Sequence, residues 1–186
     1  MFKPAGSIAK LFFICFIGLV SCSEKGSYKR KIGRLISSEI VFPDTTCLLT
    51  KTSEAYDLKA VAKMVVYFDA ETCASCALSR IWKWDEMSKI TERSDGRFQT
   101  VFIFTPEKDD VSMVERIVSR MNMERRIVYV DRNSSFRTNN PFIPEEPLFH
   151  TFLVNQKNNI VLVGDPTSSE ELWKLYEETI NGLIGK

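Results

Sequence analysis

The chain has 186 residues, of which 44% are hydrophobic and 26% are charged. This is enough for one globular domain with a real core and too little for two generous ones. The formal net charge is +1, and no basic stripe or repeat stands out. Composition therefore predicts one domain and excludes nucleic acid as an expected partner.

The first 22 residues predict export. A short positive region precedes the apolar run 11–20, which is too short to span a membrane comfortably. The ending Leu19-Val20-Ser21-Cys22 resembles the bacterial lipobox, in which the cysteine is acylated and becomes the mature N-terminus. The resemblance implies a signal peptide over 1–21 and a lipid on Cys22. An uncleaved signal anchor, or an ordinary secretory signal with a chance cysteine, remains an alternative.

Loss of the signal peptide changes the charge of the chain. Removing Lys3 and Lys10 leaves 23 of the 25 basic side chains against 24 acidic ones, a net charge of −1. We therefore expect the lipid, and not charge, to hold the protein to the membrane. Residues 22–34 are predicted to form a mobile, lipidated polar tether, and residues 35–186 the folded domain. The expected location is the extracytoplasmic side of a bacterial cell envelope.

The domain is predicted to begin with a strand. Apolar residues alternate over 35–42, and Pro43 stops the pattern. Cys47 follows, and we expect it to be a free, half-buried thiol. Pairing outside the chain, or service as a third redox partner, is the alternative for this cysteine.

A second, buried strand is followed by paired cysteines. The apolar run 64–68 predicts the strand, and Cys73 and Cys76 stand where it should turn into a helix. A helix N-terminus stabilises a thiolate, which would make Cys73 the nucleophile. Cys76 could then attack a mixed disulfide on Cys73 and release the substrate. A zinc site would usually need a second Cys or His pair, and the chain has a single histidine.

The helix after the cysteines is predicted to run to about Thr91. Its spacing favours Trp82 as a core residue, because Trp82 and Trp84 cannot share one face, and leaves Trp84 undecided.

Strands and helices alternate through the rest of the chain. Apolar runs predict strands at 98–105 and 127–130 and a hairpin of 149–154 with 160–163. Helical spacing predicts helices over 111–121 and 172–183, the second starting at a capping box of Ser168 and Glu171, and a loop over 132–147 with one helical turn around Phe136. The fold class is therefore α/β, a mixed sheet of four to five strands flanked by helices.

This order of elements, with Cys-x-x-Cys after the first buried strand, resembles the thioredoxin fold. The segments 65–76 and 151–164 carry the match, with further likeness at Val41-Phe42-Pro43-Asp44, Lys83-Trp84 and Val163-Gly164-Asp165-Pro166. Within this fold the chain looks like the TlpA-like, or redoxin, branch of membrane-anchored thiol-disulfide oxidoreductases. It is also similar to uncharacterised thioredoxin-like lipoproteins of Bacteroides-type bacteria.

The resemblance carries expectations about function. It implies thiol-disulfide exchange on extracytoplasmic protein thiols through Cys73 and Cys76, without a cofactor. We expect a monomer, with Thr72, His150 and Thr151 adjacent to the substrate.

The chain departs from the family at three positions. Thr72 stands where thioredoxins carry a tryptophan, and Tyr67 stands where they carry a buried, proton-handling aspartate. Glu71 is the carboxylate nearest to the cysteines in sequence, but sequence alone does not show that it faces Cys76. The group that transfers the proton therefore stays unassigned. The family's cis-proline should fall at His150, and Pro147 lies upstream of that position.

Two alternatives to an oxidoreductase remain open. In the family's fold His150 would point near Cys73 and Cys76, and two thiolates with one imidazole suit copper or an open zinc position. The chain would then resemble the copper chaperones of this fold. A redox-silent binding protein that keeps the fold is the other alternative.

Overall fold

The computed structural model describes residues 26–49, 60–70, 81–107, 110–120 and 126–185. The chain divides into two compact units, residues 1–34 and residues 35–186. In the first unit, residues 26–34 are helical, although a polar tether was expected there. No helix within the described ranges is long and apolar enough to cross a membrane.

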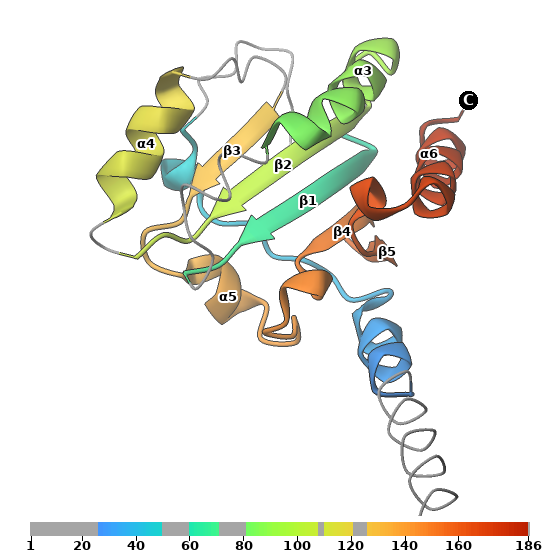
Figure 1. Cartoon of the computed structure of the whole chain (residues 1–186), viewed down its shortest axis with the longest axis horizontal. Helices are drawn as coiled ribbons and strands as arrows, with labels where there is room; N and C mark the ends of the chain where they lie inside the picture. The colour runs from blue at the N-terminus through green and yellow to red at the C-terminus, as the bar shows by residue number, and fades with distance from the viewer. Residues whose placement is uncertain (1–25, 50–59, 71–80, 108–109, 121–125, 186) are drawn as a thin grey trace, which may run out of the picture. The chain divides into compact units, whose positions relative to one another are not determined.

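The second unit is built on one five-stranded mixed sheet with the order β3-β2-β1-β4-β5 (Figure 1). The strands are β1 (Ala62–Phe68), β2 (Phe98–Phe104), β3 (Arg126–Val130), β4 (Thr151–Asn155) and β5 (Ile160–Val163). β1, β2 and β3 are parallel, whereas β4 runs antiparallel to β1 and β5 antiparallel to β4. The predicted α/β class and the thioredoxin-like fold are thereby confirmed.

Within the described ranges, helices α3 (Asp85–Arg93), α4 (Val111–Arg120) and α6 (Glu170–Ile184) cover one face of the sheet (Figure 1). Alternate residues of a strand point to opposite faces, so Met64 and Val66 of β1 pack under these helices, while Val65 and Tyr67 pack on the other side. The sheet therefore separates two apolar cores.

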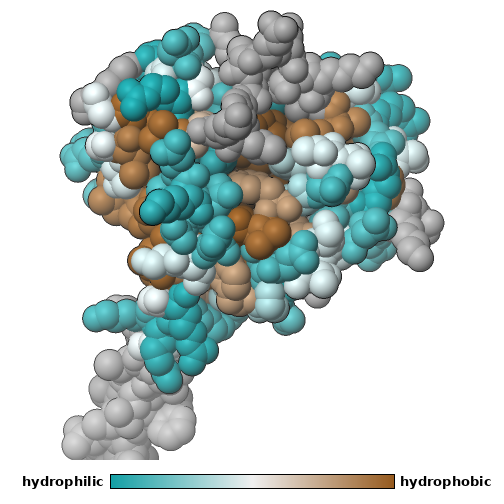
Figure 2. Space-filling model, turned by 180° about the vertical axis from the view of Figure 1, so that it is seen from behind, coloured by the Kyte–Doolittle hydropathy of each residue, from teal (hydrophilic) through white to brown (hydrophobic). Residues whose placement is uncertain are grey.

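The opposite face is covered by residues 35–49 and by the loop that carries the short helix α5 (Ser135–Asn139). Buried Asn140 fastens the two together, because its side chain accepts from Val41 N (2.9 Å) and donates to Val41 O (2.8 Å). Seen from behind, apolar side chains gather among hydrophilic ones on the surface (Figure 2). The predicted strand over 35–42 is wrong, since this segment makes only an isolated bridge, Glu39 to Asn159, among the described residues.

The prediction that Trp82 belongs to the core is wrong, and Trp84, which was left undecided, takes that place. Trp82 is 66% exposed and Trp84 is 4% exposed, so Trp84 and not Trp82 belongs to the core. The reason is that Ile81–Trp84 forms a 3-10 helix, η2, before α3 begins. A 3-10 helix has three residues per turn and an α-helix has 3.6. The side chain that faces the sheet is therefore a different one in the two kinds of helix.

Two further predictions concern single residues. The N-cap of α6 is Ser169, whose hydroxyl accepts from Leu172 N (3.2 Å), so the capping box predicted at Ser168 is wrong by one residue. Cys47 lies at the end of the 3-10 helix η1 (Thr45–Cys47) and is a free, half-buried thiol, as predicted.

Candidate functional site

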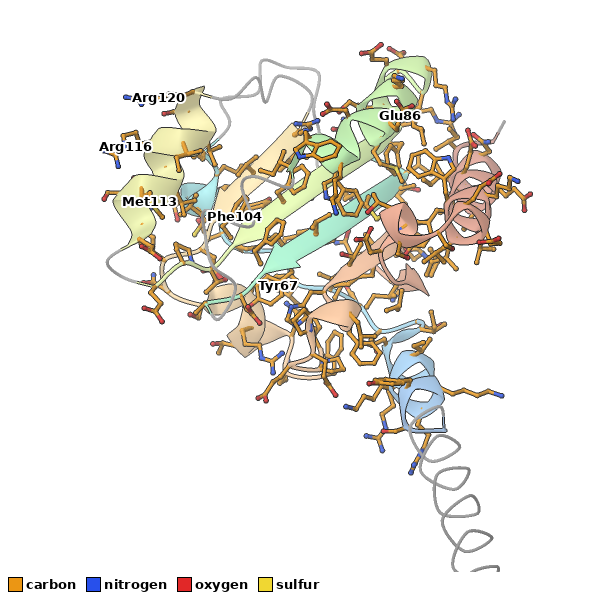
Figure 3. All side chains as sticks on the ribbon, in the orientation of Figure 1. Tyr67, Glu86, Phe104, Met113, Arg116 and Arg120 are labelled. Carbon is orange, nitrogen blue, oxygen red and sulfur yellow. The ribbon has the colours of Figure 1, made fainter. Side chains whose placement is uncertain are left out.

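The ends of two strands and the start of a third meet at one edge of the sheet. Val66 of β1 pairs with Thr151 of β4, and Tyr67 N donates to His150 O (2.9 Å). Thr105, which follows β2, donates its backbone N–H to Phe68 O (2.8 Å). Tyr67 and Phe104 mark the ends of β1 and β2 in Figure 3. This edge is where the chain continues from Ala70 toward the paired cysteines.

A pocket of about 300 Å³ opens at this edge. Its lining comes from β1, η2, the 3-10 helix η4 (Pro147–Phe149) and the segments beside β4 and β5: Val66, Tyr67, Phe68, Lys83, Trp84, Pro147, Leu148, His150, Thr151 and Asp165. The structure thus brings two of the predicted site residues, His150 and Thr151, into one pocket. Leu148 is 48% exposed at its rim and offers apolar surface to a ligand.

The other predicted site residues lie outside the described part of the chain. These are Cys22, Thr72, Cys73 and Cys76, together with Glu71. Their roles stay predictions.

His150 is buried and held from several sides. Its side chain is 3% exposed, and its ring lies 5.0 Å from the ring of Tyr67, centroid to centroid. The Nε2 atom lies 2.9 Å from Pro144 O. The Nδ1 atom lies 3.6 Å from Asp69 Oδ2, beyond hydrogen-bond distance, and has no hydrogen-bond partner among the described residues.

The charge state of His150 depends on opposing influences. Burial lowers the pKa of the imidazole below its ordinary value, because a charged ring loses hydration there. The carbonyl of Pro144 and the carboxylate of Asp69 act in the opposite direction. Burial has the opposite effect on the pKa of Tyr67, because the charged form of a tyrosine is its deprotonated form. It raises that pKa, so the hydroxyl stays protonated at neutral pH.

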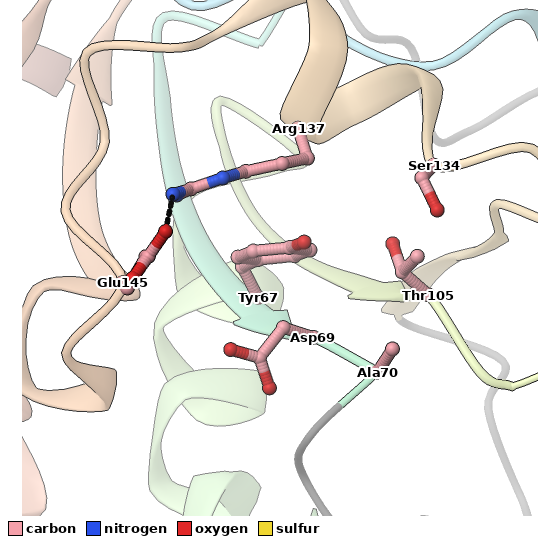
Figure 4. A pocket seen from close by; sticks show the side chains of 7 residues that line it. All are labelled: Tyr67, Asp69, Ala70, Thr105, Ser134, Arg137 and Glu145. Carbon is pink, nitrogen blue, oxygen red and sulfur yellow. Dashed lines mark ion pairs between the residues drawn. The ribbon is translucent and has the colours of Figure 1, made fainter.

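A smaller pocket, of about 180 Å³, lies on the other side of Tyr67 (Figure 4). It is lined by Tyr67, Asp69, Ala70, Thr105, Ser134, Arg137 and Glu145. Arg137 crosses it and forms an ion pair with Glu145 (3.6 Å), while its Nη1 donates to Ile143 O (2.5 Å). The guanidinium therefore fixes the loop that presents Pro144 O to His150.

The residue directly before β4 is His150, where the resemblance to the thioredoxin fold implies a cis-proline. No peptide bond within the described ranges is cis. Pro147 begins η4, and His150 ends it with φ −87° and ψ 1°, directly before β4. Pro147 therefore does not take the place immediately before the strand, and His150 does.

The predicted metal alternative depends on residues outside the described ranges. Within those ranges, no group of three histidine, cysteine or acidic side chains could hold a metal ion. His150 Nε2 already faces a carbonyl oxygen, which leaves Nδ1 as the nitrogen that could approach another group. Metal binding by Cys73, Cys76 and His150 stays a prediction.

Asp69 is the residue of this site that the sequence analysis missed. The nearest carboxylate in sequence to the cysteines is Glu71, but the carboxylate that the structure places beside His150 is that of Asp69. Its position one residue after a predicted buried strand was the available signal. The role of Pro144 O could not be foreseen, since a backbone carbonyl leaves no trace in residue type.

No protein-family model matches the chain. No curated protein matches it either. Among solved structures, a thioredoxin-like protein in its oxidized form is 10% identical, with a TM-score of 0.48, over 81% of this chain and 97% of that one.

Two further solved structures come from named bacteria. An exposed lipoprotein thioredoxin from Streptococcus pneumoniae is 12% identical, with a TM-score of 0.46, over 67% of this chain and 87% of that one. The thioredoxin domain of a thiol-disulfide oxidoreductase from Bacteroides vulgatus is 16% identical, with a TM-score of 0.40, over 67% and 82%. Because likenesses at this level do not transfer an activity, function has to come from the chain's own residues.

The buried imidazole predicts a pH-dependent stability. In the unfolded chain His150 titrates near its ordinary pKa of 6.5, and in the folded chain its pKa is lower. Below about pH 6.5 the unfolded chain therefore binds more protons, and the free energy of unfolding should fall as the pH falls, by at most about 1.4 kcal/mol per pH unit. Urea unfolding of the full chain between pH 7.5 and 5.5 measures this.

His150→Gln is the matched variant, because its amide N–H can replace Nε2–H toward Pro144 O but does not titrate. The chain has one histidine, so the pH dependence should be weaker in the variant than in the wild type. Parallel curves for the two proteins would contradict the assignment.

Proposed function

We propose that the chain is a thiol-disulfide oxidoreductase that acts on protein thiols through Cys73 and Cys76. The observation that supports the proposal is a pocket of about 300 Å³ at the edge of the sheet where β1 ends. Cys73 and Cys76 follow Phe68, the last residue of β1, by five and eight positions in the sequence. We expect a substrate disulfide to approach this edge and to contact the pocket between η2 and the start of β4.

The reaction needs no organic cofactor. The Cys73 thiolate attacks one sulfur of a substrate disulfide, forms a mixed disulfide and expels the other sulfur as a thiolate, which takes up a proton. Cys76 then loses its proton and attacks Cys73 Sγ, which closes the Cys73–Cys76 disulfide and releases the second substrate thiol. The substrate gains two electrons and the protein loses two. The same steps in reverse oxidise a dithiol.

The described pocket supports a polypeptide substrate. Leu148 and Pro147 form apolar surface beside polar His150 and Thr151, and the pocket is open to solvent along this rim. An extended segment with an apolar side chain beside its cysteine would match such a lining.

The exported location rests on the N-terminal sequence. The lipobox-like ending at Cys22 supports a lipid anchor on the extracytoplasmic side of the cell envelope, with residues 1–21 removed. That the domain acts as a monomer is a separate part of the proposal.

Serine substitutions separate the two cysteine roles. Cys73→Ser should abolish exchange, because no thiolate remains to attack the substrate. Cys76→Ser should accumulate a mixed disulfide with a model protein substrate, since the resolving thiol is gone. Non-reducing gels and mass spectrometry of the full chain in detergent would detect the adduct, and dithiothreitol should release it.

The control for these variants is Cys47→Ser, which removes the half-buried thiol of η1. It should exchange disulfides at the wild-type rate. Equal residual activity in Cys73→Ser and Cys76→Ser would refute the assigned roles.

The anchor has its own test. Cells that express the chain and are fed an alkyne-labelled fatty acid should label the wild type and Cys15→Ser, but not Cys22→Ser, because only Cys22 follows the lipobox-like residues. The unlabelled variant should also leave the membrane fraction after cleavage or accumulate as an uncleaved precursor. Labelling of Cys22→Ser at the wild-type level would refute the anchor.

A further inference from the structure

The two ring nitrogens of His150 have unlike surroundings. Nε2 lies 2.9 Å from Pro144 O, and a carbonyl oxygen can only accept, so Nε2 carries a hydrogen in either charge state. In the neutral ring Nδ1 is then a bare lone pair. It is buried in a side chain 3% exposed and has no hydrogen-bond partner among the described residues. A buried acceptor without a donor is costly.

The atom that faces this lone pair is an acceptor as well. Asp69 Oδ2 lies 3.6 Å from Nδ1, so the neutral ring places two acceptors opposite each other. A proton on Nδ1 would turn this contact into a charge-assisted hydrogen bond after a small approach. The site is thus built to accept one proton, although burial opposes the charge.

Other charged groups complete the surroundings of the ring. Arg137 of α5 disfavours the proton, and Glu146, just before η4, favours it. The hydroxyl of Tyr67 on β1 stays neutral because burial raises its pKa. Arg137 is also held by Ile143 O and by Glu145, which keeps its guanidinium on the loop.

We propose that His150 and Asp69 form a pair that holds one proton, and that the charge of this pair changes the reactivity of Cys73 and Cys76, which follow β1 in the sequence. The proposal rests on the proposed thiol chemistry. Uptake of one proton from solvent at Nδ1 changes the charge of the pair from −1 to zero, and no other bond forms or breaks. A net negative pair raises the pKa of a nearby thiol, and a neutral pair does not.

Chain connectivity limits how far the pair can act. Cys73 follows Asp69 by four positions, and four residues of extended chain span at most about 14 Å. The Debye length at physiological salt is about 8 Å, and screening is weaker for partly buried groups. Asp69 is 18% exposed. The proposal therefore requires the thiol to lie well inside the limit set by chain connectivity, and the alkylation profile below tests this requirement.

Nitrogen-15 NMR of the full chain in detergent tests the pair directly, because the chain has one histidine and its ring gives one set of signals. At alkaline pH the ring proton should sit on Nε2. Asp69→Asn should lower the proton affinity of His150 at least about threefold, because the facing charge is lost. Glu145→Gln, which removes an equal charge that faces Arg137, should change it less than about 1.5-fold.

A neutral ring with its proton on Nδ1 would overturn the proposal in the wild type, whether or not the variants fold. An unchanged proton affinity in Asp69→Asn would also overturn it.

The thiol readout separates this proposal from the proposed function. The rate of Cys73 alkylation by iodoacetamide against pH should show an inflection at the His150 pKa, which Asp69→Asn should move to lower pH and His150→Gln should abolish. Exchange activity with an unmoved alkylation profile would refute the pair and leave the oxidoreductase. The opposite outcome is also possible to observe. If Asp69→Asn changes the proton affinity of His150 and the alkylation profile of Cys73, but the wild type does not exchange disulfides, the pair is supported and the oxidoreductase is refuted.

Discussion

Antiparallel pairing between β1 and β4 places the start of β4 beside the end of β1. Val66 faces Thr151 in this register, and Tyr67 N donates to His150 O (2.9 Å). A slip by one residue would turn every side chain of β4 to the opposite face, and both faces are buried. The two apolar cores therefore fix the register, and the register brings His150 to Asp69 and to the pocket.

A histidine stands directly before β4, where the resemblance to the thioredoxin fold implies a cis-proline. A proline at this point would have no N–H and no titratable group. His150 donates its backbone N–H to Pro147 O (3.0 Å), which closes η4, and its ring reaches Pro144 O and faces Asp69. The segment before β4 is thus held by side-chain contacts and a 3-10 turn. This arrangement places a titratable group directly before β4.

Most of the sheet could be predicted from the sequence, because its strands are continuous apolar runs. The hairpin of β4 and β5 and the turn around Phe136 were also foreseen. The predicted strand over 35–42 is wrong, although Leu35 and Ile40 are buried. The backbone of this segment bonds to Asn158 and Ile160 around one isolated bridge, and these few bonds do not extend into a ladder. The wrong prediction for Trp82 has another cause, since a 3-10 turn cannot be distinguished from an α-helix by apolar spacing over four residues.

The candidate site was foreseen only in part. His150 was singled out because the resemblance to the thioredoxin fold placed the cis-proline there, and the structure adds its burial and its two neighbours, Pro144 O and Asp69. Those contacts join residues that are far apart in sequence, and they depend on the β1–β4 register and on the loop that Arg137 holds. Residue type and spacing carry no record of such contacts.

The reduction potential of the Cys73–Cys76 pair is the first quantity to measure. Cys47→Ser in the full chain, in detergent with chelator, would be equilibrated in dithiothreitol and glutathione buffers, and the free thiols counted by alkylation and mass spectrometry. A reversible two-electron transition between about −120 and −270 mV is the result that thiol-disulfide exchange requires. A pair that stays reduced across this range would contradict the oxidoreductase, and one that closes only when metal is removed would favour metal binding instead.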